Sequence, residues 1–247
     1  MISQTEENYL KALFALVNTK GEASVNELSK QLGIKMPTVN SMMRRMAGNG
    51  LVLYESYKPP KLTDKGKKEA ALIIRKHRLT EMYLVEKMGF GWEEVHDIAE
   101  HIEHIQSPLF FEKMDELLGY PTVDPHGSPI PDSSGNMVFE HYIKLSDCKA
   151  GDRATFMAVE HSSEELLRFL NSRKLLLGVV ISVKSVEPFD KSMTVSYANR
   201  KMETFSHKVC EKLLVEPKKN NFPRALPLLK VQYIKMANPE LHKRNKE

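Results

Sequence analysis

Residues 96–104, HDIAEHIEH, place three histidines and two glutamates within nine positions. On a helix with His96 at zero and about 100° per residue, Glu100 falls near 40°, Glu103 near −20° and His104 near 80°. These four side chains therefore share one face, whereas His101 points away from it and is expected to be exposed. Imidazole nitrogens and carboxylates that converge in this way are good ligands for Mn(II), Fe(II), Co(II) or Zn(II).

A second pair of the same chemistry precedes this segment. His77 and Glu81 lie one turn apart in a long apolar-rich stretch, which Thr63 can cap and Gly89 can end. Ligands from two facing helices are a common way to build a metal site in a helical protein. Each residue alone is better explained as part of a solvated polar face. All six together, on two matched faces, favour a metal site.

The first 63 residues have the pattern of a winged helix-turn-helix. An amphipathic segment, TEENYLKALFALVN, precedes SVNELSKQLG, in which Ser24 and Glu27 form a capping box and Gly33 is a natural stop. IKMPTVNSMMRRMAGNG then predicts a second short helix with Pro37 in its first turn. LVLYESYKPPKLT follows and predicts two short strands around a turn, the wing.

This pattern predicts a helix that reads the major groove of double-stranded DNA with its N-terminal residues. The candidate base readers are Pro37, Thr38, Asn40 and Ser41. The candidate phosphate contacts are Lys35, Arg44, Arg45 and, on the wing, Lys58 and Lys61. The alternative is that the helix-turn-helix only builds a small protein-protein domain, which the basic charge and the wing do not favour.

Residues 64–131 predict a helical domain that carries the metal ligands and forms a homodimer. Its helices are rich in apolar residues, and a two-fold DNA reader needs such an interface. The expected operator is therefore palindromic.

The remaining chain predicts a smaller β domain. Residues 132–144 are the predicted linker, and the proline- and glycine-rich stretch DPHGSPIPDSSG leads into it. His126 in that stretch is expected to be exposed. Residues 145–216 predict a small β-barrel with one inserted helix, capped by Ser162 or Ser163. Residues 217–247 form a basic extension that could contact DNA or pack on the dimer, and the sequence leaves both open. The predicted fold class is thus mainly α with a small β domain.

Composition limits the class of protein. The chain has 247 residues and a net charge of +4, with a basic head and tail around an acidic middle. That distribution suits a polyanion at one end and cations in the centre. No apolar run is long enough for a membrane span, and the N-terminus does not resemble a signal peptide. With only Cys148 and Cys210, a disulfide framework is not expected, so we predict a cytoplasmic protein without a membrane partner.

Several of these motifs together resemble a known family. TEENYL, MPTVNSMMRRM, GLV, LTDKGKKEA, KHRLTEMYL, VHDIAEHIEHIQS and GSPIP occur in the order seen in the diphtheria toxin repressor family of bacterial metal-activated repressors. The resemblance covers residues 1 to about 131. Residues 145–216 resemble, more weakly, the SH3-like domain that ends many members. The implied architecture is a winged helix, a helical dimerisation domain and an SH3-like β-barrel.

The resemblance also implies two metal positions in each subunit. An ancillary site would use His77, Glu81 and His96. A primary site would use Glu100, Glu103 and His104, with Asn8 from the first helix. Some members send a further ligand from the C-terminal domain, for which Glu160, Glu164 and Glu165 are candidates. An acidic first helical turn is also what the helix dipole favours without a metal.

The ligand types favour manganese. The iron-sensing branch of the family has methionine at the position of Asn8 and cysteine at that of Glu100, whereas both are oxygen donors here. Oxygen ligands suit the harder Mn(II) ion, so the chain resembles the manganese transport regulators. That branch typically has aspartate at the position of Asn8, and some members have glutamate at that of Lys11. Separated metal sites are therefore favoured over a two-metal cluster.

The sequence thus predicts a Mn(II)-activated, dimeric repressor that is not an enzyme, with genes for metal-ion uptake as its expected targets. An Fe(II)-dependent repressor of the same fold is the main alternative, because metal availability also sets selectivity. A metal hydrolase is disfavoured, since HIEH at residues 101–104 lacks the H-E-x-x-H spacing. A winged-helix regulator that senses an organic ligand would bind DNA regardless of chelators.

Overall fold

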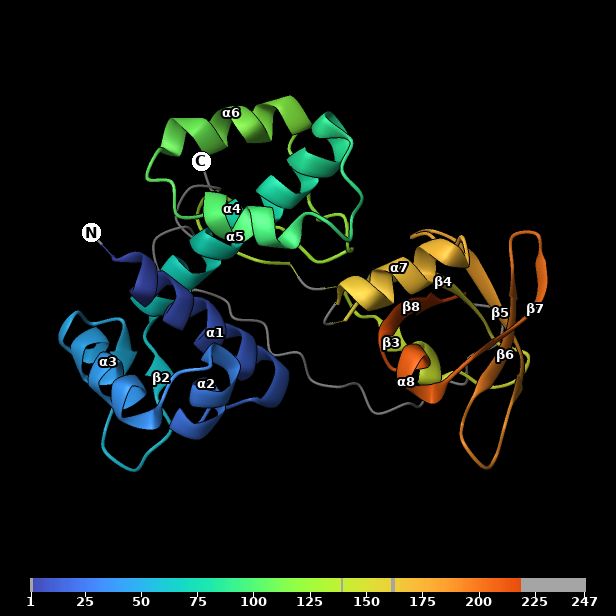
Figure 1. Cartoon of the computed structure of the whole chain (residues 1–247), viewed down its shortest axis with the longest axis horizontal. Helices are drawn as coiled ribbons and strands as arrows, with labels where there is room; N and C mark the ends of the chain where they lie inside the picture. The colour runs from blue at the N-terminus through green and yellow to red at the C-terminus, as the bar shows by residue number, and fades with distance from the viewer. Residues whose placement is uncertain (1, 139, 161–162, 219–247) are drawn as a thin grey trace, which may run out of the picture.

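The computed structural model describes residues 2–138, 140–160 and 163–218. Figure 1 shows a helical part, which contains the first six helices, and a separate β part beside it. The predicted fold class, mainly α with a small β domain, is confirmed. Among the described residues, no helix is long and apolar enough to cross a membrane.

The N-terminal unit is a winged helix-turn-helix. It consists of α1 (Gln4–Lys20), α2 (Val25–Leu32), α3 (Met36–Gly48), β1 (Val52–Leu53) and β2 (Lys61–Leu62). The strands pair antiparallel and enclose the wing.

Local sequence sets the ends of these helices. Ser3 and Ser24 each form a capping box with the glutamate three residues on. Gly33 ends α2 with a φ of 66°, a left-handed conformation that glycine adopts without strain. The apolar faces of the three helices then meet in a common core that includes Tyr9, Leu28 and Met43.

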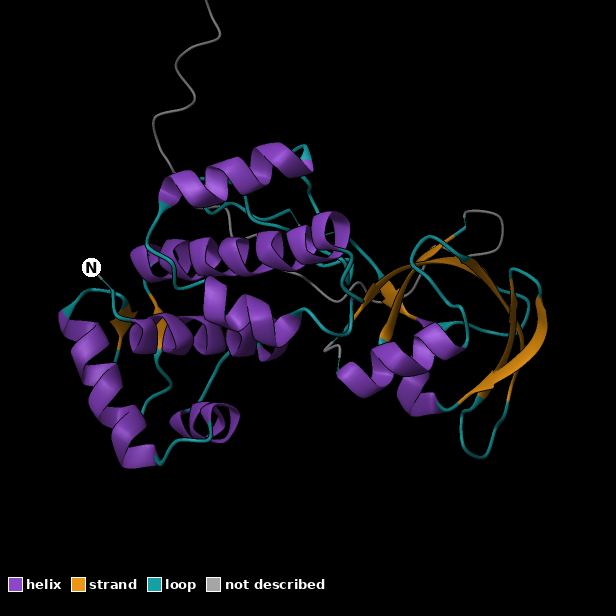
Figure 2. Ribbon diagram, turned by 45° about the horizontal axis from the view of Figure 1, so that its top comes forward, coloured by secondary structure: helices purple, strands orange, loops and turns teal. Residues whose placement is uncertain are grey.

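Helix α4 (Asp64–Met88) connects this unit to the rest of the helical part. Thr63 caps its first turn and Gly89 ends it. It contacts α1, α5 (His96–Ile102) and α6 (Pro108–Leu118), and in Figure 2 it lies between α6 and α1. This central position lets one helix carry ligands toward α5 while its other faces pack against neighbours.

The β part is a six-stranded antiparallel sheet in the order β3-β8-β4-β5-β6-β7. Its elements are β3 (Ile143–Lys144), η1 (Leu145–Asp147), β4 (Arg153–Val159), α7 (Glu164–Ser172), β5 (Val180–Val186), β6 (Met193–Tyr197), β7 (Arg200–Phe205), α8 (His207–Cys210) and β8 (Leu213–Pro217).

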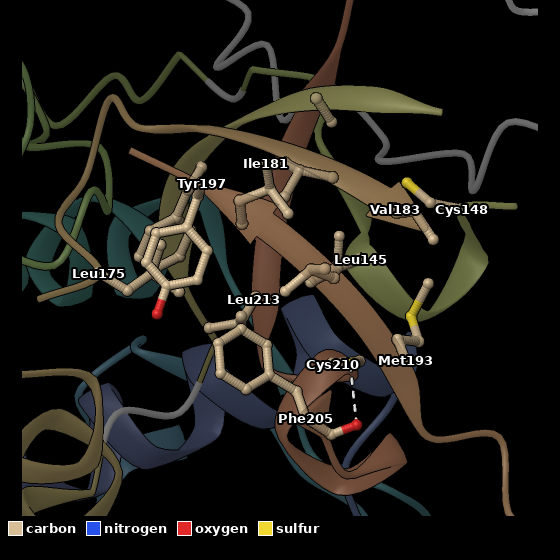
Figure 3. Close-up of a cluster of buried hydrophobic side chains, with 14 of the residues drawn as sticks. Leu145, Cys148, Leu175, Ile181, Val183, Met193, Tyr197, Phe205, Cys210 and Leu213 are labelled. Carbon is tan, nitrogen blue, oxygen red and sulfur yellow. Dashed lines mark hydrogen bonds between the residues drawn. The ribbon is translucent and has the colours of Figure 1, made fainter. Parts of the chain in front are cut away.

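The predicted closed barrel needs a correction. Among the described residues the edge strands β3 and β7 do not pair with each other, so the sheet remains open. The edge strand β3 has only two residues, and side chains from η1, α7 and α8 fill the core beside it instead. Leu145 and Cys210 take part in this packing in Figure 3.

The two cysteines are both free and buried in this core. Burial raises the pKa of each thiol to about 12, so both stay protonated at neutral pH. Cys210 donates a weak hydrogen bond to the Phe205 carbonyl at 3.9 Å. They act here as small apolar side chains.

The predicted linker at residues 132–144 lies mostly within the described residues, whereas most of the predicted C-terminal extension does not. In the segment predicted as a linker, Asp132 organises a turn by accepting from the Ser134 and Asn136 amides, and β3 begins at Ile143. The predicted basic extension at 217–247 lies, from residue 219 onward, outside the described residues.

One glycine sets the approach of α4 to the winged helix. A Cβ atom on Gly66 would lie 1.9 Å from the Leu51 carbonyl oxygen. We expect Gly66→Ala to destabilise the protein by about 1–3 kcal/mol in urea unfolding, because backbone must move to accommodate the methyl group. Gly48→Ala is the matched control, since nothing lies within 4 Å of its added Cβ and it also sits in a helix. Equal stabilities for the two variants would contradict this reading of the α4 contact.

Candidate metal centre and DNA-binding surface

His77 and Glu81 lie one turn apart on the inner face of α4, and both are buried. The Nε2 atom of His77 lies 3.0 Å from Glu81 Oε1. From the start of α5, His96 places its Nδ1 atom 3.1 Å from His77 Nε2 and 3.3 Å from Glu81 Oε1. Ligand atoms of these three residues all lie within 4.8 Å of one another. The structure thus brings together the three residues predicted for an ancillary site.

A residue from a later loop extends this cluster. His126 is 5% exposed, so the prediction that it is exposed is wrong. Its Nε2 atom donates to the Trp92 carbonyl at 2.8 Å, which leaves Nδ1 as the acceptor, 3.8 Å from Glu81 Oε2. A backbone carbonyl that fixes the tautomer in this way is typical of metal-binding histidines. We call His77, Glu81, His96 and His126 the Glu81 centre.

Asp124 lies in the same neighbourhood, within the group that contains Glu81 and His126. One of its oxygens accepts from the His126 and Ser128 amides, and the other lies 3.4 Å from Arg78 Nε. Burial raises the pKa of Asp124, although Arg78 opposes the rise. Because Asp124 accepts from the backbone amides of His126 and Ser128, it fixes the conformation of the loop that carries His126.

The proline- and glycine-rich composition of that loop concealed this contribution. The signal that was present is Asp124 two residues before His126, the spacing at which an aspartate accepts from the backbone and forms a compact turn.

The donor set of the Glu81 centre fits a divalent transition-metal ion. It offers imidazole nitrogens and a carboxylate and no sulfur, the combination that Mn(II) and Fe(II) accept. Only His96 is substantially exposed, with 64% of its side chain accessible, so solvent reaches the cluster from that side. The other three side chains are buried, which limits the movement of the ligand atoms.

A second group of predicted ligands surrounds Glu103, whose side chain is fully buried. Lys11 from α1 places its ammonium between two carboxylates: Nζ lies 2.7 Å from Glu103 Oε1 and also contacts Glu100. The other Glu103 oxygen lies 2.5 Å from His77 Nδ1. We call Lys11, Glu100 and Glu103 the Glu103 pocket.

The other two predicted primary ligands, His104 and Asn8, have different surroundings. The Nδ1 atom of His104 lies 2.5 Å from Glu7 Oε2, and its Nε2 atom is 3.8 Å from Glu103. The Oδ1 atom of Asn8 is buried without a hydrogen-bond partner among the described residues. Sequence reasoning missed Glu7, although it sits one helical turn before Lys11. A ligand role for the predicted primary set stays a prediction.

The predicted ligand from the C-terminal domain lies elsewhere. Glu164 is at the start of α7, more than half exposed, and accepts from Arg168 at 2.8 Å. It belongs to none of the ligand clusters found among the described residues. Glu160 instead pairs with Lys144 at 3.0 Å.

The DNA-binding prediction rests on the outer face of α3. Val39, Met43 and Met46 are buried and fix the helix on its domain. The exposed face presents six of the predicted residues on the helix or just before it, namely Lys35, Pro37, Thr38, Ser41, Arg44 and the partly paired Arg45. On the wing, Lys61 is exposed and Lys58 pairs with Glu55 at 2.5 Å.

Asn40 has a second role in this surface. Its Oδ1 atom accepts from the Tyr54 hydroxyl at 2.6 Å, which ties α3 to the wing. Ser41 donates to the Pro37 carbonyl at 3.1 Å.

Helix α1 links the metal-ligand region to this surface. Glu6 is 2% exposed and accepts from Asn49 Nδ2 at 2.9 Å, just beyond the end of α3, and it lies 3.4 Å from Arg45 Nε. One turn of α1 therefore contacts the recognition helix through Glu6 and the segment that follows α5 through Glu7.

The protonation of His77 yields a testable pH dependence. Burial lowers its pKa, but hydrogen bonds to Glu103 and Glu81 outweigh burial and raise the pKa from 6.5 to about 9. In the metal-free protein the charged ring therefore stabilises the fold fully below about pH 6.5, and this contribution is lost as pH rises through about 9. A metal ion must replace this proton, so we expect apparent Mn(II) affinity to rise between pH 6.5 and 8.5 with release of a proton from His77.

Calorimetric titration in buffers of different ionisation enthalpy measures that proton release. An affinity that stays constant over this pH range would show that His77 is already neutral or does not bind the ion.

Comparisons with known proteins agree on the family. Residues 1–59 match the model described as "Iron dependent repressor, N-terminal DNA binding domain", and residues 63–132 match "Iron dependent repressor, metal binding and dimerisation domain". Residues 143–217 match the FeoA domain.

Individual relatives include an iron-dependent repressor and a helix-turn-helix-type transcriptional regulator. The iron-dependent repressor IdeR of Mycobacterium tuberculosis is 35% identical over 127 residues, 51% of this chain and 55% of that protein. The chain thus spans about half the length of that relative. The transcriptional regulator MntR of Bacillus subtilis is 28% identical over 120 residues, 49% of this chain and 84% of that protein.

Solved structures match over most of the chain. A manganese-dependent transcriptional repressor in complex with manganese has a TM-score of 0.79 at 28% identity, covering 86% of this chain and 99% of that one. IdeR of T. acidophilum has a TM-score of 0.69 at 26% identity, covering 88% and 100%. With both characteristic domain models matched in order, the chain belongs to the iron-dependent repressor family, that of the diphtheria toxin repressor.

Proposed function

We propose that this protein is a Mn(II)-responsive transcriptional repressor that binds a palindromic operator as a homodimer and controls metal-ion uptake genes. The observation that carries the proposal is the Glu81 centre, where His77 and His96 lie at one oxygen of Glu81 and His126 lies 3.8 Å from the other. The same chain also presents an exposed recognition helix. A cluster of buried ligands is costly to maintain unless its charges are paired or coordinate a metal.

The donor chemistry supports manganese. All side chains of the Glu81 centre offer nitrogen or oxygen, and neither cysteine of the chain is near it, since both lie in the core of the β part. Fe(II) is the second candidate, because the IdeR relatives are named for iron and the same donors accept it. Titration with Mn(II) and, anaerobically, with Fe(II) at equal free concentrations separates the two.

A bound ion would supply positive charge beside Glu81 and join α4, α5 and the loop at residue 126. The chain itself orients the ligands for this. Glu103 holds His77 through Nδ1, so that Nε2 faces Glu81, and Trp92 holds His126 through Nε2, so that Nδ1 does. The proton that His77 carries between Glu103 and Glu81 must leave before its Nε2 can ligate.

The route from the ligands to DNA runs through α1. Because α1 contacts α3 through Glu6 and α5 through Lys11, a change in the position of α5 is transmitted to the recognition helix by a rigid element. An effector can shift this equilibrium only by binding the DNA-competent arrangement more tightly. The ion is expected to do so by fixing α5 against α4.

The homodimer is supported by exposed apolar side chains on and around α6. Leu109, Phe110, Leu117 and Tyr120 are all more than 40% exposed. Several large apolar side chains exposed on one short stretch of chain favour an interaction site there. A two-fold pairing through this face would present two recognition helices to two half-sites.

Loss of the shared carboxylate tests the metal dependence. Glu81→Gln removes the only charged ligand of the Glu81 centre, and we expect Mn(II) affinity to fall by more than the ~10–100-fold typical of disturbing the groups around a metal ligand. Metal-dependent binding to promoter fragments should be lost in the same titration range. Glu86→Gln, an exposed position on the same helix, is the control and should behave as wild type. DNA binding that is equally strong after chelation would refute the proposal.

Salt dependence tests the DNA surface. Arg44→Ala removes an exposed charge on the outer face of α3, and we expect weaker binding to all sequences with a salt slope lower by about 1 for each Arg44 that contacts phosphate. Arg168→Ala, on the β part, removes the same charge and should leave the slope unchanged. If Arg44→Ala has the same salt slope as wild type, Arg44 does not contact a DNA phosphate.

A further inference from the structure

The Glu103 pocket already contains a cation that belongs to the chain. The ammonium of Lys11 lies 2.7 and 2.9 Å from the two oxygens of Glu103 and also contacts Glu100. Glu103 is fully buried and the Lys11 side chain is only 22% exposed, so this is an interior contact. The ammonium therefore occupies the space between the two carboxylates that a bound ion would need.

The pocket holds a positive charge without a metal. Glu103 lies 2.7 Å from the Lys11 ammonium on one side and 2.5 Å from His77 Nδ1 on the other. A divalent ion entering here would meet a positive charge at hydrogen-bond distance from its carboxylate ligands, and such repulsion is strong inside a protein. The neutral amide of Asn8 cannot offset it.

The same contact joins two elements. Lys11 comes from α1 and both carboxylates come from α5 or its last turn, and Glu7 adds a second contact from α1 to His104. At the first point α1 contributes the Lys11 ammonium, and at the second it contributes the side chain of Glu7. The ammonium thereby ties the DNA-binding unit to the helix that carries the metal ligands.

We propose that Lys11 is a built-in cation that takes the place of a second metal ion, so that each subunit binds a single divalent ion, at the Glu81 centre. The statement about the metal count rests on the proposed function, while the tie between α1 and α5 does not. The α1–α5 contact is accordingly closed in metal-free protein, and metal sensing depends on the Glu81 centre alone.

Counting bound Mn(II) tests this directly. The full chain is stripped with chelator and titrated with Mn(II), and the free ion is measured by its electron paramagnetic resonance signal. We expect one tight Mn(II) per subunit for wild type. Lys11→Glu, which adds a carboxylate in place of the ammonium, and Lys11→Gln, which only removes the charge, should each bind a second ion. Lys20→Gln, which removes an exposed lysine from the same helix, should bind one.

Double variants assign each ion to its site. Glu81→Gln should bind no tight Mn(II), whereas Lys11→Glu combined with Glu81→Gln should retain one. Two tight ions in wild type, or the same count in Lys11→Glu and Lys11→Gln as in wild type, would overturn the proposal. No tight ion in wild type together with one in Lys11→Glu would keep Lys11 as the built-in cation but would overturn the single ion at the Glu81 centre, and with it the proposed metal-dependent function.

A stability measurement covers the case in which a variant folds poorly. We expect stripped Lys11→Gln to melt at a lower temperature than stripped Lys20→Gln, and saturating Mn(II) to restore much of the difference, because the ion then neutralises Glu100 and Glu103. Identical melting temperatures for the two stripped variants would show that the ammonium does not tie α1 to α5.

Discussion

The rest of the site depends on the contacts that the buried carboxylate of Glu103 makes with two other helices. It accepts from Lys11 of α1 on one side and contacts His77 of α4 on the other, while its own backbone belongs to the end of α5. Three elements thus meet at one charged group with no solvent exposure. Removing one partner of such a buried pair typically costs about 3–5 kcal/mol, because the remaining charge stays buried without compensation.

This arrangement also explains why His77 points as it does. With Nδ1 held by Glu103, its Nε2 atom faces Glu81 and His96. The same logic recurs at His126, where a backbone carbonyl takes the place of the carboxylate. Two histidines are therefore aimed at Glu81 by partners that are not themselves directed at the centre. Such partners determine ligand orientation and basicity as much as the ligands do.

A positively charged side chain lies among the predicted primary ligands. It is Lys11, whose ammonium contacts the carboxylates of Glu100 and Glu103. Helix α1 is then coupled to α5 by a tethered cation, and to α3 by Glu6. Helix α1 thus makes ionic contacts of opposite sign within its first half, through the carboxylate of Glu6 to Arg45 and through the ammonium of Lys11 to Glu100 and Glu103.

Much of the fold and part of the site could be predicted from local patterns. The capping box at Ser24, the stop at Gly33 and apolar periodicity place the helices, since these signals act within one or two turns. The pairing of His77 with Glu81 follows from helical spacing for the same reason. Local patterns could not predict that the sheet stays open, because closure depends on whether a two-residue edge strand pairs with a strand far away in the sequence.

The chain's own residue types and spacings determined that nitrogen and oxygen donors would lie on two helices beside a DNA-binding unit. Only the tertiary structure decided which of them meet. It brought His126 inward through an aspartate-organised turn, directed His104 to Glu7, and set Lys11 between Glu100 and Glu103. Those contacts join residues up to 97 positions apart, and no local periodicity encodes a distance of that kind.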